Sequence, residues 1–99
     1  MPSMRKPKEP NRRMEHEDRV VQSADTYTFT LFRGETGWYS MDFKTKEMAI
    51  AVATEFVNDP EFNKGGRPAS IYAVATGLHG HFVLIGTVFK GGLYRPAVR

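Results

Sequence analysis

One amphipathic helix, predicted for residues 45–58 (TKEMAIAVATEFVN), constrains the fold of this chain most. Thr45 is a typical N-cap residue, and Pro60 ends helical geometry near Asn58. On a helical wheel the apolar side chains cover an arc of roughly 200°, with Ile50 and Val57 at one edge. This arc is wider than one sheet face covers. Ile50 and Val57 are therefore expected either to lie under another element of the chain or to meet a partner.

Two hairpins are predicted to flank this helix. Residues 25–33 alternate threonines with apolar side chains, GETG forms a turn, and residues 38–43 form the return strand. Residues 70–77 and 81–89 form the second pair. In the last strand Val83, Ile85, Thr87 and Phe89 are expected on one face. The predicted fold is α+β: a small antiparallel four-stranded sheet in ββαββ order, with one helix packed on one face.

A single domain of 99 residues is expected, with a boundary near residue 25. Residues 1–24 contain no aromatic side chain and many charges, which predicts a disordered charged tail. Within it, residues 12–21 have the pattern of a short helix, which is marginal on its own in water. The folded part is predicted to span residues 25–99, and residues 90–99 to be a loosely ordered basic tail.

Composition excludes several classes of protein. The chain has no cysteine, so it has neither a disulfide framework nor a cysteine-based zinc site. It contains no apolar run long enough for a membrane span and no signal-peptide pattern, which favours a cytoplasmic protein without membrane contact. The net charge of +3 is modest and does not by itself indicate a nucleic-acid partner.

No catalytic or metal-binding pattern stands out. The serines lie outside nucleophile motifs, and no pair of carboxylates is forced into one cavity by its spacing. His79 and His81 lie two residues apart at a hairpin tip, but a third ligand such as His16 has no assigned position. We therefore expect no enzyme, no metal and no cofactor.

Binding is the predicted function, because one face of the sheet is expected to remain uncovered. Aromatic side chains and an arginine on such a face are typical of protein interaction sites. The hypothesis is that the protein acts as an adaptor or inhibitor of another protein. A phage or another mobile element is one conceivable origin. The predicted partner-binding residues are Trp38, Phe32, Tyr27, Arg33, Ile50 and Val57.

Two alternatives stay open. The first is a nucleic-acid-binding module with basic residues on phosphates and aromatic side chains against bases. Its predicted contacts are Arg5, Lys6, Lys8, Arg12, Arg13, Lys64, Arg67, Lys90 and Arg95. The second is a homodimer with a structural role, in which the sheets pair edge to edge or face to face.

Residues 33–57 carry the pattern Gly37-Trp38-Tyr39, Phe43, Thr45, Glu47 and Ala49. In its layout this stretch resembles the arm-type DNA-binding domains of integrases, in which a sheet leads into an alanine-rich helix. The resemblance implies a DNA-binding sheet. However, the strands lack the closely spaced Arg and Lys with which such sheets read a groove, and Arg33 stands nearly alone. We do not identify a family from it.

Overall fold

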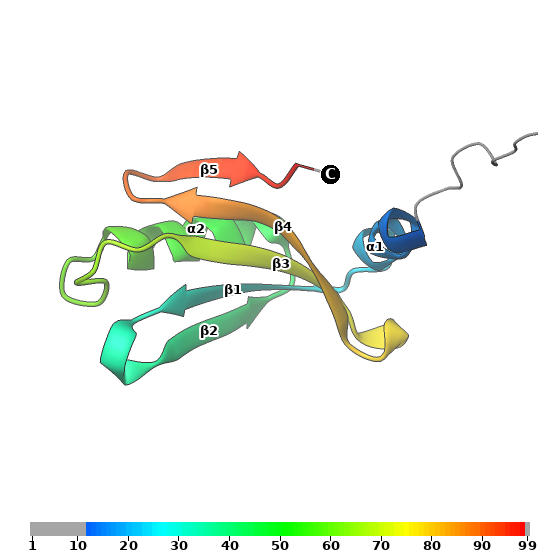
Figure 1. Cartoon of the computed structure of the whole chain (residues 1–99), viewed down its shortest axis with the longest axis horizontal. Coiled ribbons are helices and arrows are strands. Elements are labelled where there is room, and N and C mark those ends of the chain that lie inside the picture. Colours follow the sequence, from blue (N-terminus) through cyan, green and yellow to red (C-terminus); the bar gives the residue numbers. More distant parts are fainter. Residues whose placement is uncertain (1–11, 99) are drawn as a thin grey trace, which may run out of the picture.

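A computed structural model describes residues 12–98 (Figure 1). Five strands form one antiparallel sheet in the order β2-β1-β3-β4-β5, accompanied by two α-helices. Their bounds are α1 Arg12–Gln22, β1 Thr26–Phe32, β2 Trp38–Phe43, α2 Lys46–Asn58, β3 Ala69–Ala75, β4 His81–Phe89 and β5 Leu93–Pro96. The predicted α+β class and antiparallel sheet are confirmed. The predicted numbers, four strands and one helix, are wrong. No helix in the described part is long and apolar enough to cross a membrane.

The first hairpin forms as the sequence predicts. β1 and β2 pair without a register shift, and Phe32 lies opposite Trp38. A short 3-10 helix, Gly34–Thr36, makes the connection, and Gly34 and Gly37 both have positive φ. The alternation in β1 and β2 places Phe29, Leu31, Tyr39, Met41 and Phe43 on one face of the sheet, against the core. The threonines of β1 therefore lie on the other face.

Helix α2 packs on this apolar face and closes the main core. The Thr45 side chain accepts a hydrogen bond from the Met48 amide at 3.1 Å, and Asp59 is extended before Pro60, so both predicted ends are confirmed. The helix approaches the sheet closely because Ala49 and Ala53 are small. The fully buried core consists of Phe29, Leu31, Ala49, Ala53, Val57, Ala69, Ile71 and Val88.

Helix α1 agrees with the helical pattern of residues 12–21 and corrects the prediction that this segment belongs to a disordered tail. Residues Arg12–Gln22 are helical, and Val20 is completely buried against Ala75 and Val83. Because β3 alternates, Ala75 lies on the same face as Ile71 under α2. Both helices therefore cover one face of the sheet, with α1 at its far end (Figure 1). Residues 1–11 of the predicted tail lie outside the described residues.

A bulge in β4 changes the predicted faces of that strand. Ile71 pairs with Gly86 but Tyr72 pairs with Leu84, so Ile85 is an extra residue in β4. An extra residue reverses the alternation beyond it. Val88 is consequently buried in the core while Phe89 is exposed, and the prediction that Phe89 shares a face with Val83 is wrong.

Strand β5 corrects the prediction for the C-terminal segment. Residues Leu93–Pro96 pair with β4 and add a fifth strand to the sheet. The Tyr94 hydroxyl donates a hydrogen bond to the Ile85 carbonyl at 3.0 Å. The ring of Tyr94 lies directly over Gly86, where a Cβ atom would come within 2.2 Å of its oxygen. Packing by this tyrosine holds a segment that we predicted to be loosely ordered.

The connection from α2 to β3 is organised around one buried side chain. Asn63 is 5% exposed, and its amide group donates to the Val57 carbonyl at 2.9 Å and to the Arg67 carbonyl at 2.8 Å. Its oxygen accepts from the Arg67 amide at 3.1 Å. This long loop is therefore an ordered part of the fold at the end of the sheet where β2 begins.

Candidate functional site: the open face of the sheet

The face of the sheet opposite the helices is not covered by any element between residues 12 and 98. Chain alternation directs three threonine and serine side chains of β1 and β2 onto it, together with Tyr72 and Val74 of β3. Phe82 joins them because it lies opposite Val74 in the β3–β4 pair. We therefore take this uncovered face as the candidate site.

A groove of about 360 Å³ runs across this open face. Its walls are the two most exposed aromatic side chains on the face, Trp38 at 70% and Phe82 at 66%. Between them, the floor consists of Thr28, Thr30, Ser40, Tyr72 and Val74. Small hydroxyl-bearing side chains below two large rings make a slot that accepts an apolar side chain or a planar ring.

Backbone pairing and ring contacts fix both walls. Trp38 is the first residue of β2, directly after Gly37, and its ring lies 5.0 Å from that of Phe32. Phe82 sits near the start of β4 and meets the ring of Tyr72 edge-on at 5.5 Å. Each wall thus leans on a second aromatic side chain from a neighbouring strand, which limits the rotamers that it can adopt.

Arginines border the end of the open face near the 59–68 loop. The guanidinium carbon of Arg67 lies 4.8 Å from the centre of the Phe32 ring. Arg33, which was predicted to bind a partner, does not line the groove. Its guanidinium stacks on Phe62 at 3.7 Å, and its Nε donates to the Phe62 carbonyl at 3.0 Å. Arg33 therefore holds the loop, and Arg67 is the cation next to the aromatic walls.

Three predicted partner-binding residues lie away from the groove. Tyr27 is on the helix face and packs against the core, which follows from the alternation with Thr28. Ile50 packs against the same core, and Val57 is only 1% exposed. The structure therefore groups Trp38 and Phe32 on the open face and separates Tyr27, Ile50 and Val57 from them.

Among the described side chains, the basic residues predicted for nucleic acid lie at separate places, except that Lys64 and Arg67 line one pocket at the 59–68 loop. Lys64 is exposed in the 59–68 loop, Lys90 is exposed in the β4–β5 turn, and Arg95 lies 5.9 Å from the Phe89 ring centre. Arg12 and Arg13 belong to the first turn of α1, where only the backbone is described. Arg5, Lys6 and Lys8 lie outside the described residues.

Charge is balanced over the folded part. The chain has fourteen basic and eleven acidic residues; Arg5, Lys6, Lys8, Arg99 and Glu9 lie outside residues 12–98, which leaves ten of each. On the open face itself, Asp42 accepts a hydrogen bond from the Thr28 hydroxyl at 2.7 Å. The apolar surface continues instead toward β5, where Leu84, Phe89 and Leu93 are 40%, 38% and 51% exposed. The open face therefore carries exposed apolar side chains beside hydroxyl groups and the charged Asp42.

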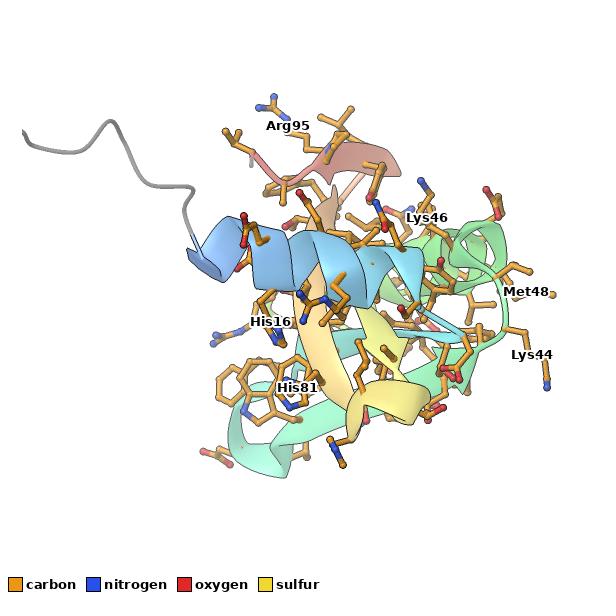
Figure 2. The ribbon with its side chains drawn as sticks, turned by 90° about the vertical axis from the view of Figure 1, so that its right-hand side faces the viewer. His16, Lys44, Lys46, Met48, His81 and Arg95 are labelled. Carbon is orange, nitrogen blue, oxygen red and sulfur yellow. The ribbon has the colours of Figure 1, made fainter. Side chains whose placement is uncertain are left out.

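The three histidines gather at the other end of the sheet. His16 of α1 and His81 of β4 lie side by side, with His16 Nε2 and His81 Nδ1 at 3.0 Å (Figure 2). The His79 ring lies 6.4 Å from that of His81. Within residues 12–98, no group of three His, Asp or Glu side chains is arranged to hold a metal ion. The His16–His81 contact joins α1 to β4.

Among the described side chains, two titratable groups have shifted pKa values, and both lie outside the groove. Hydrogen bonds from the Thr76 side chain and then from its amide lower the pKa of Asp25 below its usual 3.8. Burial raises the pKa of Tyr94 above its usual 10.0. Asp25 ties the start of β1 to the end of β3, and Tyr94 fixes β5. These shifts therefore belong to structural contacts and not to a reactive centre.

Tyr72, Val74 and Phe82 of the groove were not among the predicted partner-binding residues. The signal for Tyr72 and Val74 was the alternation in residues 70–76, which places both on the face of Phe82 once the β3–β4 hairpin is paired. Comparison with known proteins adds no further residue, since no family model, curated protein or solved structure matches the chain.

Proposed function

We propose that this protein is a non-enzymatic binding module that binds another protein, as an adaptor or inhibitor, through the groove on its open face. One observation supports the proposal most: Trp38 and Phe82 project from an uncovered face on either side of a narrow floor. Large aromatic side chains next to a pocket are the residues that dominate the binding free energy of protein interfaces.

The composition of the open face favours a protein partner. Exposed Leu84 and Leu93 extend the apolar surface beyond the aromatic walls. The core of a protein interface is depleted of charged residues and enriched in aromatic residues and arginine, as this face is with Arg67 beside Phe32. We expect the partner to insert one aromatic or branched apolar side chain between Trp38 and Phe82 and so to bury both rings.

The decisive experiment compares groove variants with a matched variant outside the groove. Trp38→Ala and Phe82→Ala each remove one wall, and Met48→Ala removes an exposed apolar side chain of helix α2, on the other side of the sheet. A partner captured by the wild type from the source cell is purified and titrated against all four proteins. We expect each wall variant to bind about 30-fold more weakly, as for a loss of about 2 kcal/mol, and Met48→Ala to bind normally.

Unchanged affinity of both wall variants would exclude the groove as the binding site. Circular dichroism and thermal unfolding of each variant establish that it is folded. Both side chains are largely exposed, so their truncation leaves the core intact. Loss of binding in a folded variant therefore reports on the interface.

A nucleic-acid-binding module is the second candidate, favoured by the contacts of the Phe32 ring with Arg67 and with the tilted Trp38 ring at one end of the groove. Such a platform suits stacking on unpaired bases. The single tryptophan, Trp38, is a direct probe: its fluorescence is titrated with random single-stranded and duplex oligonucleotides at low and moderate salt. Binding that falls by about 0.7 to 0.9 log units in affinity per log unit of salt for each phosphate contacted would favour this candidate. If the Trp38 fluorescence shows no saturable change, a protein partner remains the proposed one.

A further inference from the structure

We propose that the free edge of β2 pairs with β2 of a second copy of this chain, antiparallel and about a two-fold axis at Ser40. The pairing joins two five-stranded sheets into one continuous sheet. Both open faces then lie on the same side, because a two-fold axis perpendicular to a sheet preserves its faces. This self-association requires no partner protein and does not rest on the proposed function.

The hydrogen-bond phase of β2 is set by its hairpin with β1. The Arg33 amide donates to the Gly37 carbonyl at 2.7 Å, which makes this a hydrogen-bonded pair. In an antiparallel ladder such pairs alternate, so Tyr39 and Met41 bond to β1. Trp38, Ser40 and Asp42 therefore direct their amides and carbonyls away from β1. Among the described residues β2 has a strand on one side only, so these groups form a free edge.

Apart from the charged Asp42, the β2 edge lacks the features that normally prevent strands from pairing. Its six residues, WYSMDF, include no proline, and its register with β1 is regular throughout. The opposite edge of the sheet differs, because β5 has only four residues and includes Pro96. Short strands, proline and bulges are the usual protection of sheet edges. By this criterion β5 is protected and β2 is not.

One register makes this edge complementary to itself. With Ser40 opposite Ser40 of the second copy, Trp38 lies opposite Asp42 and Asp42 opposite Trp38. Every outward-facing residue of β2 then has an outward-facing counterpart, and each such pair exchanges two backbone hydrogen bonds. A shift by two residues in either direction leaves one of these residues without a counterpart inside the strand.

The side chains match in the same register. On the open face the Trp38 indole N–H lies opposite a carboxylate acceptor, Asp42 of the second copy, while the two Asp42 carboxylates stay apart. On the helix face Tyr39 lies opposite Met41, a favourable aromatic–sulfur pair. Each cross-strand pair is therefore favourable, which argues for a second copy over an unrelated strand.

Because the chain has no cysteine, one substitution tests the register directly. Ser40→Cys places two thiols across the two-fold axis at a Cα spacing of about 5.5 Å, which suits a disulfide. Under mild oxidation we expect a covalent dimer of about 22 kDa, twice the 11.2 kDa chain. Thr87→Cys, on the same face but three strands away, is the matched control and should stay monomeric. Cross-linking of Thr87→Cys but not of Ser40→Cys would overturn the proposal in favour of a face-to-face dimer.

Light scattering on the purified wild-type chain, over a series of concentrations, measures the association without any modification. We expect the mass to rise from 11.2 kDa toward twice that value. Ser40→Pro removes the outward amide at the two-fold axis, a position where an edge strand tolerates proline, and should keep the mass at that of one chain. A wild-type chain that stays monomeric at its highest soluble concentration, or a folded Ser40→Pro that still dimerises, would refute the β2 pairing. Neither outcome bears on the groove, because no partner protein is present.

Discussion

Substitution of Gly86 by alanine is the sharpest test of how β5 is held. A Cβ atom at this position would lie 2.2 Å from the Tyr94 oxygen and 2.4 Å from two ring carbons. Ordinary contacts of a Cβ atom begin near 3.4 Å. The ring must therefore move by more than about 1 Å. That movement breaks the 3.0 Å hydrogen bond from the Tyr94 hydroxyl to the Ile85 carbonyl.

We expect Gly86→Ala to lower the free energy of unfolding by about 2–4 kcal/mol. Overpacking of a tight site costs about 1–3 kcal/mol, and the lost hydrogen bond adds about 1 kcal/mol. The measurement is urea unfolding followed by far-UV circular dichroism, with the wild type in parallel. Loss of the Tyr94 contact should also bring its pKa back toward 10.0 in a spectrophotometric titration, because burial is what raises it.

The same substitution in a Tyr94→Ala background separates the clash from other effects of alanine. Without the ring, Gly86→Ala should be neutral or stabilising by up to about 1 kcal/mol, because alanine loses less backbone entropy than glycine on folding. The two backgrounds should then differ by at least about 2 kcal/mol. An equal loss in both would show that the Tyr94 ring does not limit the space above Gly86, and the reasoning would fail.

Three further perturbations test other contacts. Val20→Ala should lower the free energy of unfolding by about 1–3 kcal/mol, measured by urea unfolding, because Val20 is the fully buried side chain of α1; no change would mean that α1 does not dock. Asn63→Ala should cost about 1–3 kcal/mol and speed limited proteolysis of the 59–68 loop, because the Val57 and Arg67 carbonyls lose their donor. Asp25→Asn should destabilise the protein at neutral pH, and the difference from the wild type should vanish as pH falls below 3.8. A carboxylate whose pKa is lowered by folding stabilises the folded protein at pH values above its unfolded pKa, and this stabilisation is lost as the pH falls through its folded pKa. A difference in thermal unfolding that does not depend on pH would contradict this account.

Local patterns sufficed to predict the centre of the fold. The alternation in residues 26–32 and 38–43 fixes which side chains face the helix, because the period of a strand leaves only two choices. The ends of α2 depend on Thr45 and on Pro60, which act within one turn of the helix. The same alternation places Trp38 and Phe32 together on the open face, while their role in binding a partner stays a prediction.

Long-range packing decided what the sequence did not reveal. Helix α1 is polar over most of its length, and its docking depends on Val20 meeting Ala75 and Val83 more than fifty residues away. Strand β5 depends on the fit of Tyr94 over Gly86, which no periodicity encodes. These contacts lie outside any local window, so segments at both ends of the sequence were wrongly expected to be loose.

In the candidate site, too, local patterns were predictable from the sequence and long-range contacts were not. The bulge at Ile85 cannot be recognised from the sequence, because β4 has apolar residues on both faces. The bulge places Phe89 on the open face. Arg33 follows Phe32 in sequence, but its side chain is captured by Phe62 from the loop after α2. The side-chain identities predicted an aromatic face, whereas the position of each cation depended on tertiary neighbours.

The uncovered face follows from the way the chain connects its strands. The β2–α2–β3 connection passes over one face with β1 in between, and α1 docks on that same face, so both helices form a single layer. A five-stranded sheet has two faces, and the described chain supplies a cover for one. The other retains Trp38, Phe82 and Leu93 largely exposed. Several large apolar side chains exposed on one face are costly to leave in water, which is why we propose that this face binds a partner.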